Sequence, residues 1–479
     1  MDSQLYLDHF PLKLFNTASR QKETVVPLEK EHIKMYTCGP TVYNFAHIGN
    51  FRTYVFEDLL RRTIKFFGFK ITQVMNLTDV DDKTIKGAIA HNVSLNDYTK
   101  PYKEAFFEDL RTLRIEPVEH YPAATDYIPQ MIEMVEVLLS KQIAYIGGDG
   151  SVYFAIEKFP RYGCLSHLHL DDLQAGASDR VASDEYEKEN VADFVLWKSY
   201  EPERDGQIFW QSPFGPGRPG WHLECSAMAM KLLGETIDIH VGGVDNMFPH
   251  HENEIAQSEA CSGNLFVKLW MHSEHLLVDQ KKMSKSLGNF YTLRDLLGKG
   301  YEGVQVRYLL LQTHYKTQLN FTFQGLDATK SALNRLQDFI YRLNEVKGNE
   351  PGGRMEELCQ RTLDHFAEAL ADDLNISAAL AAIFDFVRDV NCLCDSGQID
   401  QEEAQRALEA MKRFDSVLGV LSFDKQEPEI PLDLKEAFER RLQARQEKQW
   451  KLADELRDFI QQRGYVIEDT PSGVRLKKG

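Results

Sequence analysis

The first 80 residues carry the pattern that most restricts how this chain can fold. A short apolar run at 33–37 ends in the turn Cys38-Gly39-Pro40, and an amphipathic stretch at 51–67 follows. A second apolar run lies at 71–77. Strand, glycine-bearing turn, helix and strand in this order predict a β-α-β unit of a parallel sheet. In such a sheet, ligands gather at the carboxyl ends of the strands.

The sheet is predicted to be interrupted and then resumed. Residues 115–220 contain a helix at 128–141 and a loop rich in Gly and Pro at 212–220, which indicates an insertion. Strand character returns at 237–241 and 265–278. We therefore predict a Rossmann-like α/β domain split into two segments, 1–114 and 221–325.

The remaining chain is predicted to form two further parts. Helical periodicity dominates from 326 onward and predicts an α-helical bundle at 326–427. Pro428 and Pro431 then indicate a linker. A helix at 434–463, closed by Gly464, and a hairpin at 465–476 predict a small mixed α/β domain at 431–479.

Composition excludes several classes of protein. The chain has 479 residues, 43% hydrophobic and 27% charged, with neither a basic region before an apolar stretch at its start nor an apolar run long enough to span a bilayer. Seven scattered cysteines predict a reduced, cytoplasmic protein. A net charge of −18 argues against non-specific coating of nucleic acid, although residues 431–479 carry a small positive excess.

Two motifs point to phosphate chemistry. His47-Ile48-Gly49-Asn50 lies where the first turn enters the helix, so N–H groups and two side chains face outward at a positive helix terminus. Gly49 would let a base or ribose approach the backbone closely. A histidine that merely caps the helix is the alternative for this motif.

The second motif is the loop from Lys282 to Asn289. It places the ammonium groups of Lys282 and Lys285 three residues apart on a flexible loop. Such groups can stabilise the negative charge that moves onto pyrophosphate as it leaves. A solvated lysine loop is the alternative.

In this order and spacing, the two motifs resemble the HIGH and KMSKS signatures of class I aminoacyl-tRNA synthetases. Further segments resemble the cysteinyl-tRNA synthetase family in particular: YTCGPTVY at 36–43, NLTDVDDK at 76–83, GWHLECSAM at 220–228 and FPHHENE at 248–254. Two residues depart from the expected pattern. Asn50 replaces the second histidine of HIGH and cannot become cationic, and Asn246 replaces an apolar residue.

The resemblance implies a two-step reaction. Cysteine and ATP, accompanied by Mg²⁺, would give cysteinyl-adenylate and pyrophosphate, and cysteine would then pass to the 3′-terminal adenosine of tRNA(Cys). It implies catalytic roles for His47, Asn50, Lys282 and Lys285. Nucleotide contacts would come from Gly49, Asp245 and Lys285. A monomer is expected.

The metal expectation rests mainly on the resemblance. His250 and Glu254 are four residues apart, a spacing that can hold a metal but that equally describes a solvated helix. The resemblance implies one zinc ion held by Cys38, Cys225, His250 and Glu254, with His251 as the wrong choice of register. Zinc would accept the thiolate of cysteine and discriminate against serine, so no editing activity is expected. Cys164, His167, Cys392 and Cys394 are interpreted as packing residues.

The resemblance also implies contacts to the amino acid and to tRNA. Gly39, Thr41 and Thr78 would lie near the amino acid, and Trp221 would lie against its side chain, with a core aromatic as the alternative. In the tail, the expected anticodon contacts are Arg445, Trp450, Asp454 and Asp469, whereas a salt-bridged surface helix is the alternative.

Two rival functions remain open. A related ligase that joins cysteine to an amino-sugar would share the zinc and nucleotide sites but lack residues 431–479. A non-catalytic RNA-binding paralogue is the other rival, and the intact lysines and zinc-ligand candidates argue against it.

Overall fold

The computed structural model describes residues 9–168, 193–284, 287–348, 352–423, 431–470 and 473–478. The chain divides into two units, Met1–Leu421 and Ser422–Gly479. No helix among the described residues is long and apolar enough to cross a membrane.

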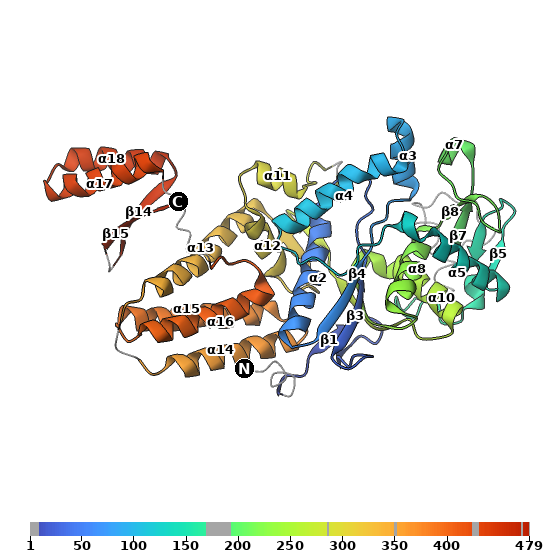
Figure 1. Ribbon diagram of the computed structural model, residues 1–479, viewed down its shortest axis with the longest axis horizontal. Helices are drawn as coiled ribbons and strands as arrows, with labels where there is room; N and C mark the ends of the chain where they lie inside the picture. The colour runs from blue at the N-terminus through green and yellow to red at the C-terminus, as the bar shows by residue number, and fades with distance from the viewer. Residues whose placement is uncertain are drawn as a thin grey trace. The chain divides into compact units, whose positions relative to one another are not determined.

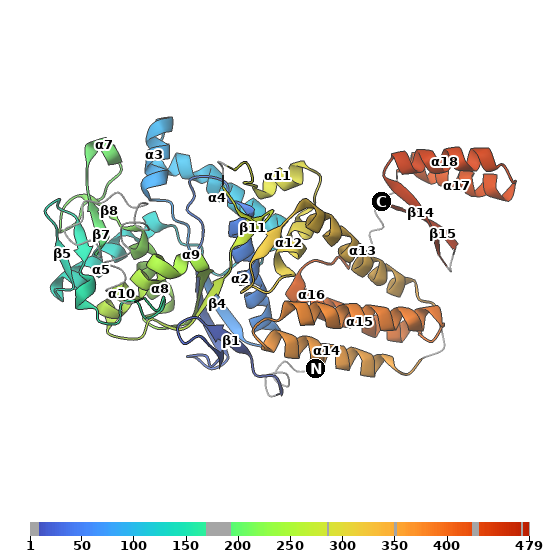
Figure 2. The ribbon, with the colours of Figure 1, turned by 180° about the vertical axis from the view of Figure 1, so that it is seen from behind.

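A four-stranded parallel sheet forms the centre of the first unit (Figures 1 and 2). Its strand order is β10-β9-β3-β4, with β3 at His32–Thr37, β4 at Lys70–Met75, β9 at Ile237–Gly243 and β10 at Val267–Ser273. All seven residues of β9 are buried, as expected for an inner strand of a sheet covered on both faces. The predicted Rossmann-like sheet is therefore confirmed.

Helices cover both faces of this sheet. α2 (Ile48–Phe66) connects β3 to β4 and lies on one side, whereas α8 (Trp221–Leu233) and α10 (Glu252–Ser262) lie on the other (Figures 1 and 2). The short segments α9 (Val244–Asn246) and η3 (Met247–His251) join β9 to α10. Chain segments from before and after the insertion thus belong to the same sheet.

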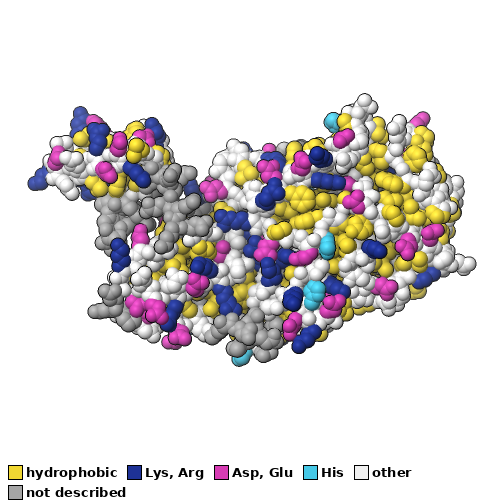
Figure 3. Space-filling model, in the orientation of Figure 1, with side chains coloured by type: hydrophobic (Ala, Val, Ile, Leu, Met, Phe, Trp, Pro, Cys, Tyr) yellow, Lys and Arg dark blue, Asp and Glu magenta, His cyan; other side chains and the backbone are white. Residues whose placement is uncertain are grey.

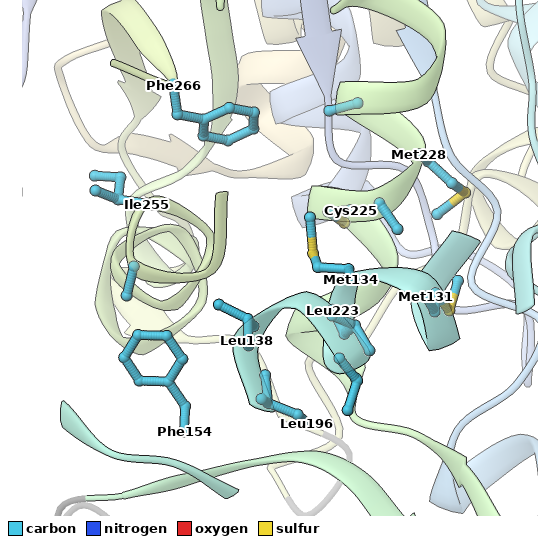
Figure 4. Close-up of a cluster of buried hydrophobic side chains, with 14 of the residues drawn as sticks. Met131, Met134, Leu138, Phe154, Leu196, Leu223, Cys225, Met228, Ile255 and Phe266 are labelled. Atoms are coloured by element: carbon cyan, nitrogen blue, oxygen red, sulfur yellow. The ribbon is translucent and has the colours of Figure 1, made fainter. Parts of the chain in front are cut away.

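The insertion has its own antiparallel sheet but shares a core with the parallel sheet. Its strand order is β5-β6-β7-β8 (Ala144–Ile146, Val152–Phe154, Phe194–Ser199 and Gly217–Pro219). Figure 4 shows side chains of α5 (Ile128–Ser140) and β6 packed toward α8 and α10, with Leu138, Phe154 and Ile255 in one buried cluster. Cys225 belongs to the same cluster.

The other elements of the first unit surround this centre. Those outside the bundle are β1 (Lys13–Asn16), β2 (Gln21–Thr24), α3 (Asp82–His91), α4 (Leu95–Thr112), η1 (Ala124–Tyr127), η2 (Ile156–Lys158), α7 (Pro202–Asp205), β11 (Leu276–Val278), β12 (Lys281–Lys282), α11 (Leu293–Gly298), α12 (Gly303–Leu311) and β13 (Leu319–Phe321). The long helices of the bundle are α13 (Phe323–Glu345), α14 (Met355–Ala371), α15 (Ile376–Asp395) and α16 (Gln401–Leu418).

The strand character expected at 265–278 is confirmed, and it belongs to two strands in different sheets. β10 ends at Ser273, and β11 pairs instead with β12 and β13 in a separate three-stranded sheet. The expectation that the parallel sheet extends to residue 278 is therefore wrong. Two residues, Glu274 and His275, separate the strands and redirect the chain.

The second unit is a helical hairpin followed by a β-hairpin. Its elements are α17 (Leu432–Gln446), α18 (Trp450–Gln462), β14 (Tyr465–Thr470) and β15 (Gly473–Lys478). The single helix expected at 434–463 is wrong, because the chain turns at 447–449, where Lys448 has a left-handed φ of 59°. Leu434, Ala437 and Ile460 form the small core that joins the two helices.

Candidate active site

Four buried side chains converge at the carboxyl end of the parallel sheet. They are Cys38 after β3, Cys225 on α8, His250 on η3 and Glu254 on α10, and their ligand atoms all lie within 4.8 Å of one another. His250 Nε2 is 3.0 Å from a Glu254 oxygen, and Cys38 Sγ is 3.9 Å from the same oxygen. The sheet thus brings together residues that are up to 216 positions apart.

Neighbouring groups shift the pKa values of three members of this cluster. A hydrogen bond from Cys38 lowers the pKa of the Cys225 thiol to about 6. Burial opposes charging of His250, but Glu254 and Cys225 outweigh it and raise the pKa of His250 to about 10. Burial likewise opposes ionisation of Glu254, yet His240 and His250 lower its pKa to about 2. Two sulfur, one imidazole and one carboxylate donor form a set that suits a tetrahedral zinc ion.

Two further histidines lie within hydrogen-bonding distance of these donors. His222 Nδ1 lies 2.8 Å from His250 Nδ1, and His240 Nε2 lies 2.9 Å from Glu254 Oε2. These two histidines were not predicted from the sequence. His222 follows Trp221 in the family segment at 220–228, but His240 sits inside an apolar strand and has no local pattern that signals it.

His251 also lies near the cluster. Its Nε2 is 3.4 Å from Cys38 Sγ, and with Cys38, His240 and Glu254 it forms a second group of donors within 4.8 Å of one another. Its Nδ1 is bound to His272 Nε2 at 2.8 Å, and burial and the neighbouring histidines hold the pKa of His251 well below its ordinary value. His272 was not predicted either.

The loops after β3 and β4 run side by side next to Cys38. Gly39 N donates to Asn76 Oδ1 at 3.0 Å, and a Cβ at Gly39 would stand 1.8 Å from the backbone oxygen of Asn76. Thr41 and Thr78 form a parallel bridge in these loops. The structure therefore places Gly39, Thr41 and Thr78 in two adjacent loops, with Gly39 directly after Cys38.

Trp221 is not a core residue, contrary to the alternative raised from the sequence. Its side chain is 43% exposed and stacks on the His250 ring, with centroids 4.2 Å apart. Figure 3 shows hydrophobic side chains gathered on the same unit between α4 and strands β7 and β8. Trp221 therefore lies partly exposed against one of the four buried donors.

The two signature motifs lie against each other. His47 caps α2, its Nδ1 accepts from Asn50 N at 3.2 Å, and Asn50 Oδ1 accepts from His47 N at 3.1 Å. Gly49 is so close to the second motif that an added Cβ would stand 3.0 Å from Met283 Cε. Ile48 N also donates to Tyr291 O.

The other residues expected to contact the nucleotide are Lys282, Lys285 and Asp245. Lys282 is exposed on β12, and Lys285 lies outside the described residues. Asp245 lies in α9, directly after the carboxyl end of β9. Cys164, Cys392 and Cys394 belong to neither donor group in the described chain.

In the second unit, three expected contacts flank the break between α17 and α18. Arg445 is exposed near the end of α17, and Trp450 begins α18 with 60% of its side chain exposed. Asp454 follows one helical turn later and pairs with Arg457 at 3.4 Å. Asp469 lies on β14, but its side chain falls outside the described residues.

Comparison with known families agrees along most of the chain. Residues 24–331 match the tRNA synthetases class I (C) catalytic domain, 365–422 match a DALR domain, and 427–475 match the cysteinyl-tRNA ligase anticodon binding domain.

Whole-chain relatives agree with these matches. A Cysteine–tRNA ligase of Protochlamydia amoebophila is 73% identical and covers 98% of this chain and 99% of its own length. The Cysteine–tRNA ligase of Chlamydia caviae is 58% identical and covers 98% of each. Among solved structures, methionyl-tRNA synthetase of Mycobacterium tuberculosis in complex with methionyl-adenylate shares the fold, with a TM-score of 0.58, 13% identity and coverage of 81% of this chain and 90% of that one. The chain belongs to the cysteine–tRNA ligase family of class I aminoacyl-tRNA synthetases.

Proposed function

We propose that this protein activates L-cysteine with ATP, accompanied by Mg²⁺, to cysteinyl-adenylate and pyrophosphate, and then transfers cysteine to the 3′-terminal adenosine of tRNA(Cys). The observation that carries this proposal is the buried set of Cys38, Cys225, His250 and Glu254, which lies at the carboxyl end of the sheet where such folds bind ligands. The match to the anticodon binding domain at 427–475 argues against a cysteine ligase for amino-sugars and supports a tRNA substrate.

The four donors would hold one zinc ion. Zinc bound there would select the deprotonated sulfur of cysteine, because the hydroxyl of serine stays protonated and is a poor ligand. Trp221 would cover the side chain of the bound amino acid, and the backbone at Gly39 with Thr41 and Thr78 would orient its amino and carboxylate groups. We accordingly propose that no hydrolytic editing is needed.

The nucleotide is proposed to bind where the two signatures meet. His47 and Asn50 at the start of α2 would contact phosphate oxygens, helped by the positive end of the helix. Lys282 and Lys285 would stabilise the charge that moves onto pyrophosphate, Gly49 would leave room for the adenosine, and Asp245 would bind its ribose. Positioning and charge stabilisation suffice, since the carboxylate of cysteine attacks the α-phosphate directly.

The remaining proposals concern the whole chain. Residues 1–114 and 221–325 would form the catalytic domain, 115–220 its insertion, 326–427 the bundle and 431–479 the anticodon-binding domain. Arg445, Trp450, Asp454 and Asp469 would contact the anticodon. We further propose a cytoplasmic monomer.

The exchange of labelled pyrophosphate into ATP tests the first half of the reaction. We expect exchange with cysteine and not with serine, and attachment of cysteine to tRNA(Cys) when that tRNA is added. Serine-dependent exchange at a comparable rate would contradict the role of the four donors. Absence of exchange in folded, zinc-loaded protein would contradict the proposed activity itself.

A further inference from the structure

One turn of the insertion holds the helix that carries Glu254. This segment, residues 161–166, is called here the clasp turn, and it contacts α10 at three points. Arg161 Nη1 lies 2.5 Å from Glu259 Oε2, and the Tyr162 hydroxyl donates to Asn253 Oδ1. The third contact, at Glu252, is the most extensive.

The Glu252 carboxylate accepts four hydrogen bonds from the clasp turn. Oε1 accepts from Gly163 N at 2.8 Å, and Oε2 accepts from Leu165 N at 3.1 Å, Ser166 N at 2.9 Å and Ser166 Oγ at 3.0 Å. Glu252 is fully buried. Hydrogen bonds to a buried carboxylate are strong because the acceptor is charged, so this contact fixes the turn to the helix.

The shape of the clasp turn depends on Gly163. Its φ is +92°, and an added Cβ would stand 2.2 Å from Leu168 O. A side chain at this position would therefore displace the backbone that donates to Glu252. The backbone conformation at Gly163 is therefore needed for the hydrogen bonds between the clasp turn and Glu252.

Glu252 is two residues before Glu254 in the first turn of α10. At 100° per residue, the two side chains leave the helix in nearly opposite directions. Glu252 faces the insertion, while Glu254 faces Cys38, His240 and His250. Any slide or rotation of this helix end would move the Glu254 oxygens away from their partners.

We infer that Glu252, through the clasp turn, is a positioning residue for the proposed zinc site. This inference rests on the proposed function. Glu252 contacts none of the four donors directly, so its effect is on where α10 begins and on how firmly Glu254 and His250 are held. Groups that hydrogen-bond directly to metal ligands tune metal affinity by about 10- to 100-fold, and Glu252 would act one step further out, through the position of α10.

The full-length, zinc-loaded protein and its Glu252→Gln variant test the inference. Glutamine has the same shape, but its NH₂ group must face at least one N–H or hydroxyl donor of the clasp turn. Zinc release to an excess of a chromophoric chelator should be about tenfold faster or more, and the KM for cysteine should rise while the KM for ATP stays unchanged.

Glu259→Gln is the matched control. It removes a carboxylate from the same helix that contacts the same turn, but seven residues further on. We expect it to lower thermal stability and to leave zinc release within about twofold of wild type. Equal acceleration in both variants would mean general loosening of the helix and would overturn the inference, as would an unchanged release rate in Glu252→Gln.

Further measurements distinguish failure of this inference from failure of the proposed metal site. If Glu252→Gln does not fold, Ser166→Ala removes one of the four hydrogen bonds and should still speed zinc release and raise the KM for cysteine; no change in either would overturn the inference. A wild-type protein that takes up no zinc would overturn the proposed metal site together with the inference. Zinc uptake by wild type with equal release rates would overturn the inference alone.

Discussion

Asn50 has a defined task at the start of α2 although it replaces the histidine of the family signature. It accepts from His47 N through Oδ1, and its own N–H donates to His47 Nδ1. Because Nδ1 accepts a hydrogen bond, the proton of the neutral His47 ring lies on Nε2. The side chain of Asn50 therefore closes the helix end, while its backbone N–H places the His47 proton on Nε2, the nitrogen that would donate to the proposed phosphate.

Two substitutions at this position separate these tasks. Asn50→Ala removes the acceptor and should lower the free energy of unfolding by about 1 kcal/mol, measured by urea denaturation. Asn50→Asp keeps the acceptor and should retain stability, but its charge should repel ATP and raise the KM for ATP in pyrophosphate exchange. An Asp variant with the ATP affinity of wild type would contradict a place for Asn50 beside the phosphates.

The residues of the site differ in how far the sequence could predict them. The four donors and both signatures were predicted because each lies in a local segment with a family pattern. His222, His240 and His272 were missed, because their role arises only when α8, β9 and β10 meet η3 and α10. A histidine within an apolar strand has no period or spacing that distinguishes a supporting residue from a packing residue.

At the scale of elements, a buried ion pair joins α2 to α12. Arg307 Nη2 lies 2.5 Å from Asp58 Oδ2, and both side chains are fully buried. Arg62 Nε reaches the same oxygen at 2.7 Å, and Arg307 Nε donates to Leu418 O at the end of α16. These contacts connect α2, which His47 caps, to the helical bundle. Burial opposes ionisation of Asp58, but Arg307 and Arg62 outweigh it and lower its pKa.

Asp58→Asn should be strongly destabilising, by about 3 to 5 kcal/mol, because it leaves Arg307 buried without its counter-charge. The lowered pKa of Asp58 in the folded state stabilises the protein above the ordinary aspartate pKa of about 4, and this contribution is lost as pH falls. The difference between wild type and variant should therefore narrow in acid, as urea denaturation at several pH values would show.

Asp385→Asn provides the control for this prediction. Its partner Arg388 lies at 2.8 Å, but both side chains are more than 60% exposed. Exposed pairs contribute little, so the free energy of unfolding should change by less than about 1 kcal/mol. A similar loss in both variants would contradict the importance of burial at Asp58.

Helices and strands were predicted best where the local sequence pattern alone determines them. The strands and helix of the opening β-α-β unit follow from apolar spacing and one turn. The break between α17 and α18 was missed, because Glu447, Lys448 and Gln449 are all good helix formers and nothing local signals a left-handed residue. The packing of Leu434 and Ala437 against Ile460 requires the chain to turn there, and that packing overrides local propensity.

At the scale of the whole molecule, the chain consists of two units with separate cores. We propose that the first unit activates and transfers cysteine and that the second unit recognises tRNA. Trp450→Ala should therefore raise the KM for tRNA(Cys) by about 5- to 150-fold, since base stacking on an aromatic ring contributes about 1 to 3 kcal/mol per base. Cysteine-dependent pyrophosphate exchange should be unchanged.

Leu432→Ala is the matched control for Trp450→Ala. Leu432 is 73% exposed in the same unit and lies outside the expected contacts. Its substitution should leave both the KM for tRNA and the exchange rate unchanged. Loss of exchange in Trp450→Ala would contradict the separation of the two tasks.

The strand order of the central sheet has a consequence for synthesis on the ribosome. β3 lies between β4 and β9, yet Ile237, which begins β9, is 200 residues after Thr37, which ends β3. Ribosomes add about 5 to 20 residues per second, so about 10 to 40 seconds pass between the synthesis of β3 and that of β9. During that time the edge of β3 that pairs with β9 has no partner strand. The growing chain must keep that edge from pairing wrongly, and the proposed zinc site can be loaded only after Glu254 has emerged.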